Sequence, residues 1–173
     1  MTQNQLDEQI WELRVPMFRL AMSILHHSQN AEDAVSSAVL AAYQKLGTLR
    51  DDAALKPWLL KITARCCYDL LRRSRRETVQ NEWEETVFVE PEEQTLREML
   101  RQLPAQHEQV LTLYYYEGFS IKEIADVLHM NAAAVAMRLS RGRKQLRELL
   151  EMDEEDGDAQ NTVGRNAASC CTK

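Results

Sequence analysis

Glycine and aromatic residues are scarce in this chain of 173 residues, which has 5 glycines and 6% Phe, Trp and Tyr. Alternating Val, Ile, Thr and aromatic residues, which indicate strands, are nearly absent outside residues 86–89. No apolar run approaches the roughly 20 residues of a membrane span, and the polar N-terminus MTQNQLDEQ is unlike a signal peptide. We therefore expect an all-α protein that stays in the cytoplasm without membrane insertion.

Residue patterns for catalysis or metal binding are also missing. The 4 cysteines form two adjacent pairs, Cys66-Cys67 and Cys170-Cys171, and neither has metal-ligand spacing. Neighbouring cysteines rarely form an unstrained disulfide, so we interpret the first pair as packed thiols and the second as loose thiols in a tail. His26-His27 indicates a polar helix end. With no Gly-rich phosphate loop and no nucleophile beside a base at motif spacing, we expect no catalytic residue, metal, cofactor or small-molecule substrate, and hence no enzyme.

Residues 120–143, SIKEIADVLHMNAAAVAMRLSRGR, predict two short helices around a tight turn. Ser120 and Glu123 have the spacing of a capping box, and Asn131 is a natural cap for the second helix. Helical periodicity places Val135, Leu139 and Leu146 of that helix inward, with Arg138, Arg141 and Arg143 available outward. Such a pair fits a helix-turn-helix whose second helix enters the major groove of DNA. An ordinary helical hairpin with a solvated basic face is the alternative. Five Lys or Arg between residues 138 and 147, with no acid among them, argue against it.

Charge is strongly segregated along the chain, whose formal net charge is -6. Residues 45–76 carry nine Lys or Arg against three Asp, whereas residues 77–98 carry eight Glu and one Arg. An acidic protein binds nucleic acid only when its basic residues are gathered in this way. The pattern gives two basic patches separated and flanked by acid, and the length and composition agree with two small helical domains. Their predicted bounds are 1–76 for the first domain, 77–95 for the linker, 96–151 for the second domain and 152–173 for a disordered tail.

The first domain shows several amphipathic helices. Pro16 predicts a boundary or kink within the first apolar stripe, and residues 31–46 predict a second helix that Gly47 ends. The third begins near Pro57, and its basic side chains fall on one side, with tyrosines nearby. Cations with interleaved aromatic rings suit single-stranded DNA, because they hold phosphates while the rings stack on unpaired bases. The alternative, which we favour for each tyrosine taken alone, is that Tyr43 and Tyr68 complete the hydrophobic core.

Three blocks of the chain together carry a resemblance to a known family. They are residues 31–46 (AEDAVSSAVLAAYQKL), residues 49–76 (LRDDAALKPWLLKITARCCYDLLRRSRR) and residues 100–149, which contain the helix-turn-helix. In this order they resemble an extracytoplasmic-function sigma factor of the sigma-70 family. The resemblance implies a sigma region 2 domain at 1–76 and a sigma region 4 domain at 96–151, joined by a flexible linker at 77–95.

The resemblance also implies partners and site residues. The implied partners are core RNA polymerase, through the clamp helices of its largest subunit and its flap, promoter DNA, and an anti-sigma factor. Residues implied in polymerase binding are Asp33, Val35, Ser36, Val39, Leu40 and Tyr43. Residues implied in binding the opened minus-ten element are Arg50, Asp51, Lys56, Trp58, Lys61, Arg65, Tyr68, Arg72, Arg73 and Arg76. Residues implied in binding the minus-thirty-five duplex are Ser120, Lys122, Ala133, Ala134, Ala136, Met137, Arg138, Arg141, Arg143 and Lys144.

Several residues depart from the usual family pattern. Ser36-Ser37 stand where Gln-Glu is common, and Arg65 replaces a frequent Asn. Alanines at 133, 134 and 136 occupy the start of the recognition helix, where Thr and Lys are frequent. Alanine can touch a thymine methyl group but makes no bidentate hydrogen bond to a base. We therefore expect this helix to bind mainly through phosphates and to recognise its site by DNA shape.

Two other functions are compatible with parts of the sequence. A freestanding helix-turn-helix regulator would explain residues 120–143 but leave the basic block at 45–76 unused. A sigma-like decoy that binds an anti-sigma protein without supporting transcription would explain the departures at Ser36-Ser37 and in the recognition helix.

Overall fold

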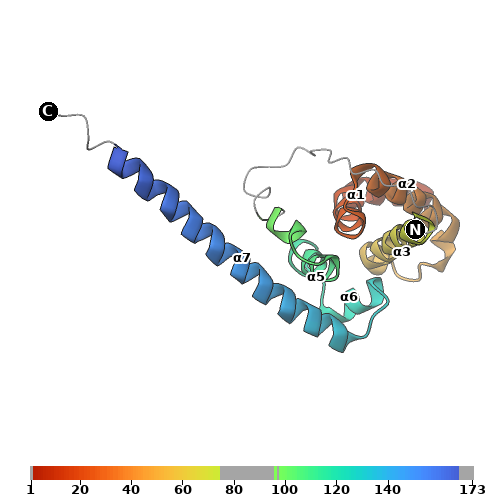
Figure 1. Ribbon diagram of the computed structural model, residues 1–173. Coiled ribbons are helices and arrows are strands. Elements are labelled where there is room, and N and C mark those ends of the chain that lie inside the picture. Colours follow the sequence, from red (N-terminus) through yellow and green to blue (C-terminus); the bar gives the residue numbers. More distant parts are fainter. Residues whose placement is uncertain (1, 75–95, 97, 168–173) are drawn as a thin grey trace.

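The computed structural model describes residues 2–74, 96 and 98–167, and the side chains of these residues except 3 and 152–167. Within these ranges the chain is helical with short connections, and no strand occurs, so the predicted all-α class is confirmed (Figure 1). The strand-like segment at 86–89, the acidic linker and the second cysteine pair lie outside the described residues.

Helix α1, Gln3–Leu25, is a single helix. The Thr2 hydroxyl accepts a hydrogen bond from the backbone N–H of Gln5 at 3.4 Å, and the Gln5 Oε1 accepts one from the Thr2 N–H at 2.8 Å. Pro16 lies inside the helix, so the predicted boundary at this residue is wrong. A proline inside a helix removes one backbone hydrogen bond. Burial of the apolar face around the neighbouring Met17, which is fully buried, offsets that loss.

Helix α2, Ser28–Lys45, begins three residues earlier than the sequence pattern predicts. His26 ends α1 in the left-handed conformation, with φ of 52°, and the His27 Nδ1 accepts a hydrogen bond from the N–H of Asn30 at 3.3 Å. The two histidines therefore form a helix end, as interpreted from the sequence. Because the His27 ring supplies a cap acceptor, residues 28–30 become the first helical turn instead of a break.

The buried face of α2 consists of small residues. Ala31, Ala34, Ala38 and Ala42 are fully buried at spacings of three and four residues, so they line one side of the helix. This alanine seam faces α1 and α3, both of which pack on α2. Small side chains allow the three helices to approach closely, and they leave the opposite face of α2 open to solvent.

Two short 3₁₀ turns, η1 (Leu46–Thr48) and η2 (Asp52–Ala54), lead into helix α3, Leu55–Ser74. The predicted packed thiols lie on α3, but Cys67 is the buried one and Cys66 is only half-buried. Burial raises the pKa of the Cys67 thiol to about 12. Helices α1, α2 and α3 form one group, which we call the N-terminal bundle.

The C-terminal bundle comprises residues 98–151. After a helical segment at 98–101, helix α5 (Ala105–Leu111) continues directly into one π-helical turn, η3 (Thr112–Tyr116). Helices α6 (Ile121–Val127) and α7 (Ala132–Ala167) follow. Helix α7 crosses α5 at Gly142, where a Cβ atom would lie 3.0 Å from the Leu111 Cδ1. Gly142 thus permits a close approach of α5 and α7.

Helix α7 also corrects one expectation. The sequence predicted a disordered tail from residue 152, whereas α7 continues as a helix to Ala167 (Figure 1). No proline interrupts residues 152–167, but this stretch contains two glycines, three aspartates and two asparagines, which are poor helix formers. Its composition therefore does not explain the helical extension.

The two bundles contact each other directly. Helix α1 packs against α5 and η3, and α3 packs against α6. In Figure 1, α5 lies beside α1 and α6 lies below α3. The buried apolar residues of both bundles form one continuous cluster. The N-terminal and C-terminal bundles are thus joined in a closed arrangement.

Candidate nucleic-acid and polymerase interfaces

The helix-turn-helix begins with the predicted capping box. The Ser120 hydroxyl accepts a hydrogen bond from the backbone N–H of Glu123 at 3.3 Å, and the Glu123 Oε2 accepts one from the Ser120 N–H at 2.9 Å. The hydrogen bond that the Ser120 hydroxyl donates to the Glu123 carboxylate, followed by the one from the Ser120 N–H, lowers the pKa of Glu123. The backbone N–H groups of Ser120 and Glu123, which have no acceptor within the helix, thus each have a side-chain acceptor. Ile124 and Val127 are buried and anchor α6, while Lys122 stays exposed.

The turn between α6 and α7 also follows the sequence pattern. His129 adopts the left-handed conformation with φ of 52°, and the Met130 N–H donates to the Ala125 carbonyl at 2.9 Å. The Asn131 Oδ1 accepts a hydrogen bond from the Ala134 N–H at 2.7 Å, which caps α7 as predicted. Two helices joined by a short, well-capped turn give the second helix a fixed direction, as major-groove binding requires.

The first turns of α7 present a smooth outer face. Ala133, Ala136 and Met137 are exposed, whereas Ala134 is half-buried. Val135, one of the residues expected to face inward, is fully buried. The exposed side chains at the start of the helix therefore offer apolar contact and no hydrogen-bond donor to a base edge.

The cations of α7 differ in how they are held. Arg141 and Lys144 are exposed, and the Lys144 Nζ lies 3.7 Å from the Glu148 Oε1. Arg138 is half-buried rather than fully outward, with its Nη1 3.2 Å from the Met130 sulfur. The Arg143 guanidinium lies over two tyrosine rings. Arg141, Arg143 and Lys144 are thus the exposed cations of this group, and Arg143 is the one that lies over tyrosine rings.

Two tyrosines that sequence reasoning missed support Arg143. Its guanidinium carbon lies 4.9 Å from the ring centre of Tyr114 and 5.5 Å from that of Tyr115. The two rings meet edge to face with centres 5.1 Å apart. Cation–π contacts at exposed sites contribute about 0.5–1 kcal/mol each. The run Tyr114-Tyr115-Tyr116 directly before the helix-turn-helix is the sequence signal that points to such a platform.

The basic side chains predicted on one face of α3 differ in exposure and in their contacts. Arg65, Arg72 and Arg73 are exposed and Lys61 is half-buried. The Arg72 Nη2 lies 2.6 Å from the Asp69 Oδ1, so an acid on the same helix partly neutralises this face. Arg76 lies outside the described residues.

The loop before α3 contributes two exposed residues, Arg50 and Asp51. Asp51 has a structural contact, because its Oδ1 accepts a hydrogen bond from the Ala53 N–H at 3.0 Å and so caps η2. Trp58 is half-buried and packs against the core. The loop and the start of α3 are therefore fixed locally by a cap and an aromatic anchor.

Lys56 and Tyr68 do not lie on a free surface of α3. The Lys56 Nζ donates a hydrogen bond to the Glu117 carbonyl at 3.0 Å, and the Tyr68 hydroxyl donates one to the Gln109 Oε1 at 2.9 Å. Glu117 and Gln109 belong to the C-terminal bundle. Burial raises the pKa of Tyr68. Two residues predicted to bind the minus-ten element are thus engaged by the other half of the protein.

The exposed face of α2 carries the residues predicted to bind polymerase. Asp33, Ser36, Leu40 and Tyr43 are exposed, and Val35 and Val39 are half-buried, a set that follows one side of the helix. Leu40 is 65% exposed, which is unusual for a leucine on a packed helix. The Tyr43 hydroxyl donates a hydrogen bond to the Asp7 carboxylate, which raises the pKa of Tyr43.

Helix α1 extends this apolar face in a way that sequence reasoning missed. Trp11 and Val15 are 67% and 49% exposed, and they follow Asp7 at four-residue intervals. Because Asp7 contacts Tyr43, the two apolar residues continue along the side of α1 that borders α2. The signal in the sequence is that Trp11 and Val15 do not fall on the side of α1 that carries its buried residues, such as Leu6 and Met17.

Comparisons with known proteins agree with this architecture. The family described as Sigma-70 region 2 matches residues 12–77, and the one described as Sigma-70, region 4 matches residues 93–146. The chain is 31% identical over 140 residues to the ECF RNA polymerase sigma factor SigM of Mycobacterium tuberculosis. The aligned region covers 78% of this chain and 71% of SigM.

A second relative agrees with these matches, and a solved structure has the same fold. The chain is 32% identical over 148 residues to the probable RNA polymerase sigma factor RfaY of Xanthomonas campestris. The aligned region covers 76% of this chain but only 37% of RfaY. The sigma factor RpoE of Bartonella quintana, solved with the anti-sigma factor NepR, has a TM-score of 0.72 at 22% identity. The superposed region covers 86% of this chain and 98% of RpoE. This likeness shows a shared fold.

A two-part helical protein with a capped helix-turn-helix belongs, by fold, to the class of DNA-binding proteins. The paired matches to regions 2 and 4, together with the relatives, show that this chain belongs to the extracytoplasmic-function sigma factors of the sigma-70 family. Proteins of this family are DNA-binding regulators rather than enzymes. Among the described residues, no helix is long and apolar enough to cross a membrane.

Proposed function

We propose that this chain is an alternative sigma factor that binds core RNA polymerase and directs promoter recognition, DNA opening and the start of transcription. The observation that carries the proposal is the occurrence of both regions in one chain, in family order, with a capped helix-turn-helix in the second. A freestanding regulator would need only the C-terminal bundle, so the matched region 2 argues against that alternative. The proposed place of action is the cytoplasm.

Each surface has a proposed role. The exposed face of α2, centred on Leu40, binds the polymerase clamp, and the residues of α3 and the preceding loop bind the opened minus-ten strand. The start of α7 enters the minus-thirty-five major groove. Because its exposed residues there are Ala133, Ala136 and Met137, Arg141 and Lys144 provide phosphate contacts that position the helix, and DNA shape provides much of the recognition.

The deciding experiment is run-off transcription with purified chain and core RNA polymerase. The proposal expects transcripts from a specific promoter, and DNA binding that occurs equally well without polymerase would favour a freestanding regulator. Absence of both activities, with retained binding of an anti-sigma protein, would favour a sigma-like decoy.

Replacing Arg72 and Arg73 is expected to impair promoter opening, measured by permanganate reactivity, more than closed-complex binding. Equal losses in both steps would contradict the assignment of α3.

A surface variant tests the polymerase contact. Leu40→Asp is expected to weaken binding to core polymerase at least tenfold, because a charge replaces an exposed apolar side chain at the centre of the proposed interface. Stability should change by less than about 0.5 kcal/mol, since Leu40 is not buried. Gln106→Asp, at an exposed position on α5, is the matched control and should bind polymerase like the parent chain.

We also propose an anti-sigma protein as a regulatory partner. The support is the fold shared with RpoE, which was solved in complex with the anti-sigma factor NepR. Co-purification of the chain with the product of a neighbouring gene, followed by loss of run-off transcription when that product is added, is the expected result.

A further inference from the structure

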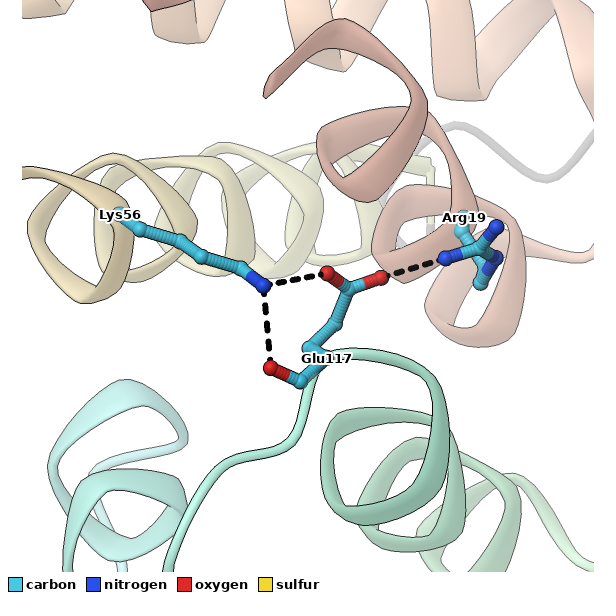
Figure 2. Close-up of polar contacts among 3 residues, drawn as sticks. All are labelled: Arg19, Lys56 and Glu117. Carbon is cyan, nitrogen blue, oxygen red and sulfur yellow. Dashed lines mark hydrogen bonds and ion pairs between the residues drawn. The ribbon is translucent and has the colours of Figure 1, made fainter. Parts of the chain in front are cut away.

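Glu117 joins the two bundles through a buried carboxylate (Figure 2). Its Oε1 accepts a hydrogen bond from the Arg19 Nη1 at 2.6 Å, and its Oε2 lies 3.1 Å from the Lys56 Nζ. Lys56 also donates to the Glu117 carbonyl oxygen at 3.0 Å. The Glu117 side chain is only 2% exposed. In Figure 2, Arg19 on α1 and Lys56 on α3 reach Glu117 from opposite sides.

The local backbone directs Glu117 toward the N-terminal bundle. The π-helical turn η3 ends with a hydrogen bond from the Glu117 N–H to the Thr112 carbonyl at 3.4 Å. Gly118 follows with φ of +70°, a conformation that favours glycine. The chain therefore leaves η3 sharply and turns the Glu117 side chain away from its own bundle.

Ring contacts reinforce the same junction. The Arg19 guanidinium carbon lies 4.6 Å from the Tyr116 ring centre, and the Lys56 Nζ lies 5.4 Å from that of Phe119. Each cation is thus placed between a carboxylate and an aromatic face. Arg19 and Lys56 are 98 and 61 residues from Glu117 in sequence, so these contacts link separate parts of the fold.

A buried carboxylate without its cations is strongly unfavourable, because the charge loses water without gaining a partner. Opening the bundles must expose Glu117, Arg19 and Lys56 to solvent together. The side chains of Arg19 and Lys56 are 27% and 35% exposed, so dissolved salt and competing anions can reach them. The ion pairs therefore determine which groups meet in the closed arrangement, and they are open to electrostatic competition.

The junction also covers residues proposed to bind DNA. Lys56 binds Glu117, and Tyr68 donates its hydroxyl hydrogen to the Gln109 Oε1 at 2.9 Å. A phosphate oxygen would need the same Lys56 ammonium group, and an unpaired base would need access to Tyr68. Carboxylate and phosphate are both anions that accept hydrogen bonds from lysine.

We propose that Glu117 is an internal latch that occupies the phosphate position at Lys56 and holds the free chain closed, so that the C-terminal bundle masks part of the minus-ten DNA surface. The masking rests on the proposed function, whereas the closure itself does not. Promoter DNA or polymerase binding opens the latch by competing for the same contacts. The measured affinity for single-stranded DNA then equals the affinity of the open chain multiplied by the fraction of chains that are open.

The closure is tested on the full chain alone, by small-angle X-ray scattering. Glu117→Gln removes the latch charge and keeps the side-chain shape, and Arg19→Gln removes one cation from the other bundle. Both variants should show a larger radius of gyration than the parent chain. Asp126→Asn, which removes the same charge from an exposed position on α6, is the control and should stay compact. Arg19→Gln decides the result if Glu117→Gln unfolds the C-terminal bundle, and a folded Arg19→Gln chain that stays compact would overturn the latch.

The masking is tested by the affinity for a labelled single-stranded oligonucleotide with a minus-ten sequence. Glu117→Gln and Arg19→Gln should bind on the order of tenfold more tightly than the parent chain at the same salt concentration, whereas Asp126→Asn should show only the small general effect of one lost negative charge. Expansion without a gain in affinity would overturn the masking. If no form binds the oligonucleotide, the proposed minus-ten surface fails with the masking, while scattering still decides the closure.

Discussion

Replacing Gly142 by alanine should destabilise the C-terminal bundle, because this glycine lies where α7 crosses α5. An alanine Cβ would lie 3.0 Å from the Leu111 Cδ1 and 3.2 Å from the His107 Cβ. Carbon atoms pack best at about 3.5–4.0 Å. Leu111 is buried, and the His107 Cβ is attached to the main chain of α5, so neither atom can move without shifting its surroundings.

The contact is held from both helices. The His107 Nδ1 lies within hydrogen-bond distance of the Gln145 Oε1, at 2.7 Å, which ties α5 to α7 one turn beyond Gly142. Overpacking of this kind costs about 1–3 kcal/mol. Alanine gains about 1 kcal/mol over glycine in a helix interior. After this gain is subtracted, we expect a net loss of up to about 2 kcal/mol.

Thermal unfolding followed by circular dichroism measures this loss, and each kcal/mol corresponds to about 4–8 °C in a domain of this size. Gly47→Ala is the matched control, because nothing lies within 4 Å of its Cβ position. Gly47→Ala should leave the melting temperature unchanged or raise it slightly. If Gly142→Ala melts at or above the parent temperature, the close approach of α5 and α7 does not limit the packing.

Three further predictions concern a helix cap, a buried thiol and a DNA-binding charge. Ser120→Ala should destabilise the C-terminal bundle by about 1 kcal/mol in urea unfolding at pH 7. Because hydrogen bonds lower the pKa of Glu123 in the folded chain, this difference should shrink as the pH falls below the ordinary value of 4.5, and a constant difference would count against the capping box. The folded Cys67 thiol stays protonated up to about pH 12, while the unfolded thiol ionises near 9, so stability should fall above pH 9 and Cys67→Ala should remove that part of the decline. Lys144→Ala should reduce the salt dependence of minus-thirty-five duplex binding by about one unit of slope, whereas Ser140→Ala, also exposed on α7, should not; equal slopes for the two variants would exclude a phosphate contact by Lys144.

Local signals in the sequence predicted much of the helix-turn-helix. The capping box of Ser120 and Glu123 and the Asn131 cap involve residues three positions apart, so their geometry is fixed by a single helical turn. The inward positions of Val135 and Leu139 follow from helical periodicity in the same way. Such features depend little on the rest of the fold.

The junction between the bundles was not predictable from the same signals. Glu117 contacts Arg19 and Lys56 across 98 and 61 residues, and no local pattern specifies which distant cation meets a given carboxylate. Sequence analysis therefore placed Lys56 and Tyr68 on an open DNA surface, whereas the structure engages both in the closed arrangement. One correction at a helix end has a local cause of a different kind, since the His27 side chain caps α2 and starts it three residues early.

The alanine seam of α2 has a consequence for how this helix tolerates change. Every fully buried position on it is already the smallest side chain that forms good helix, so any enlargement would displace α1 or α3. The outer side, around Leu40, has no such constraint, because solvent borders it. Substitutions at the exposed contact residues of α2, such as Ser36 and Leu40, can therefore change which partner the helix binds, while the buried alanines keep the position of the helix in the bundle constant.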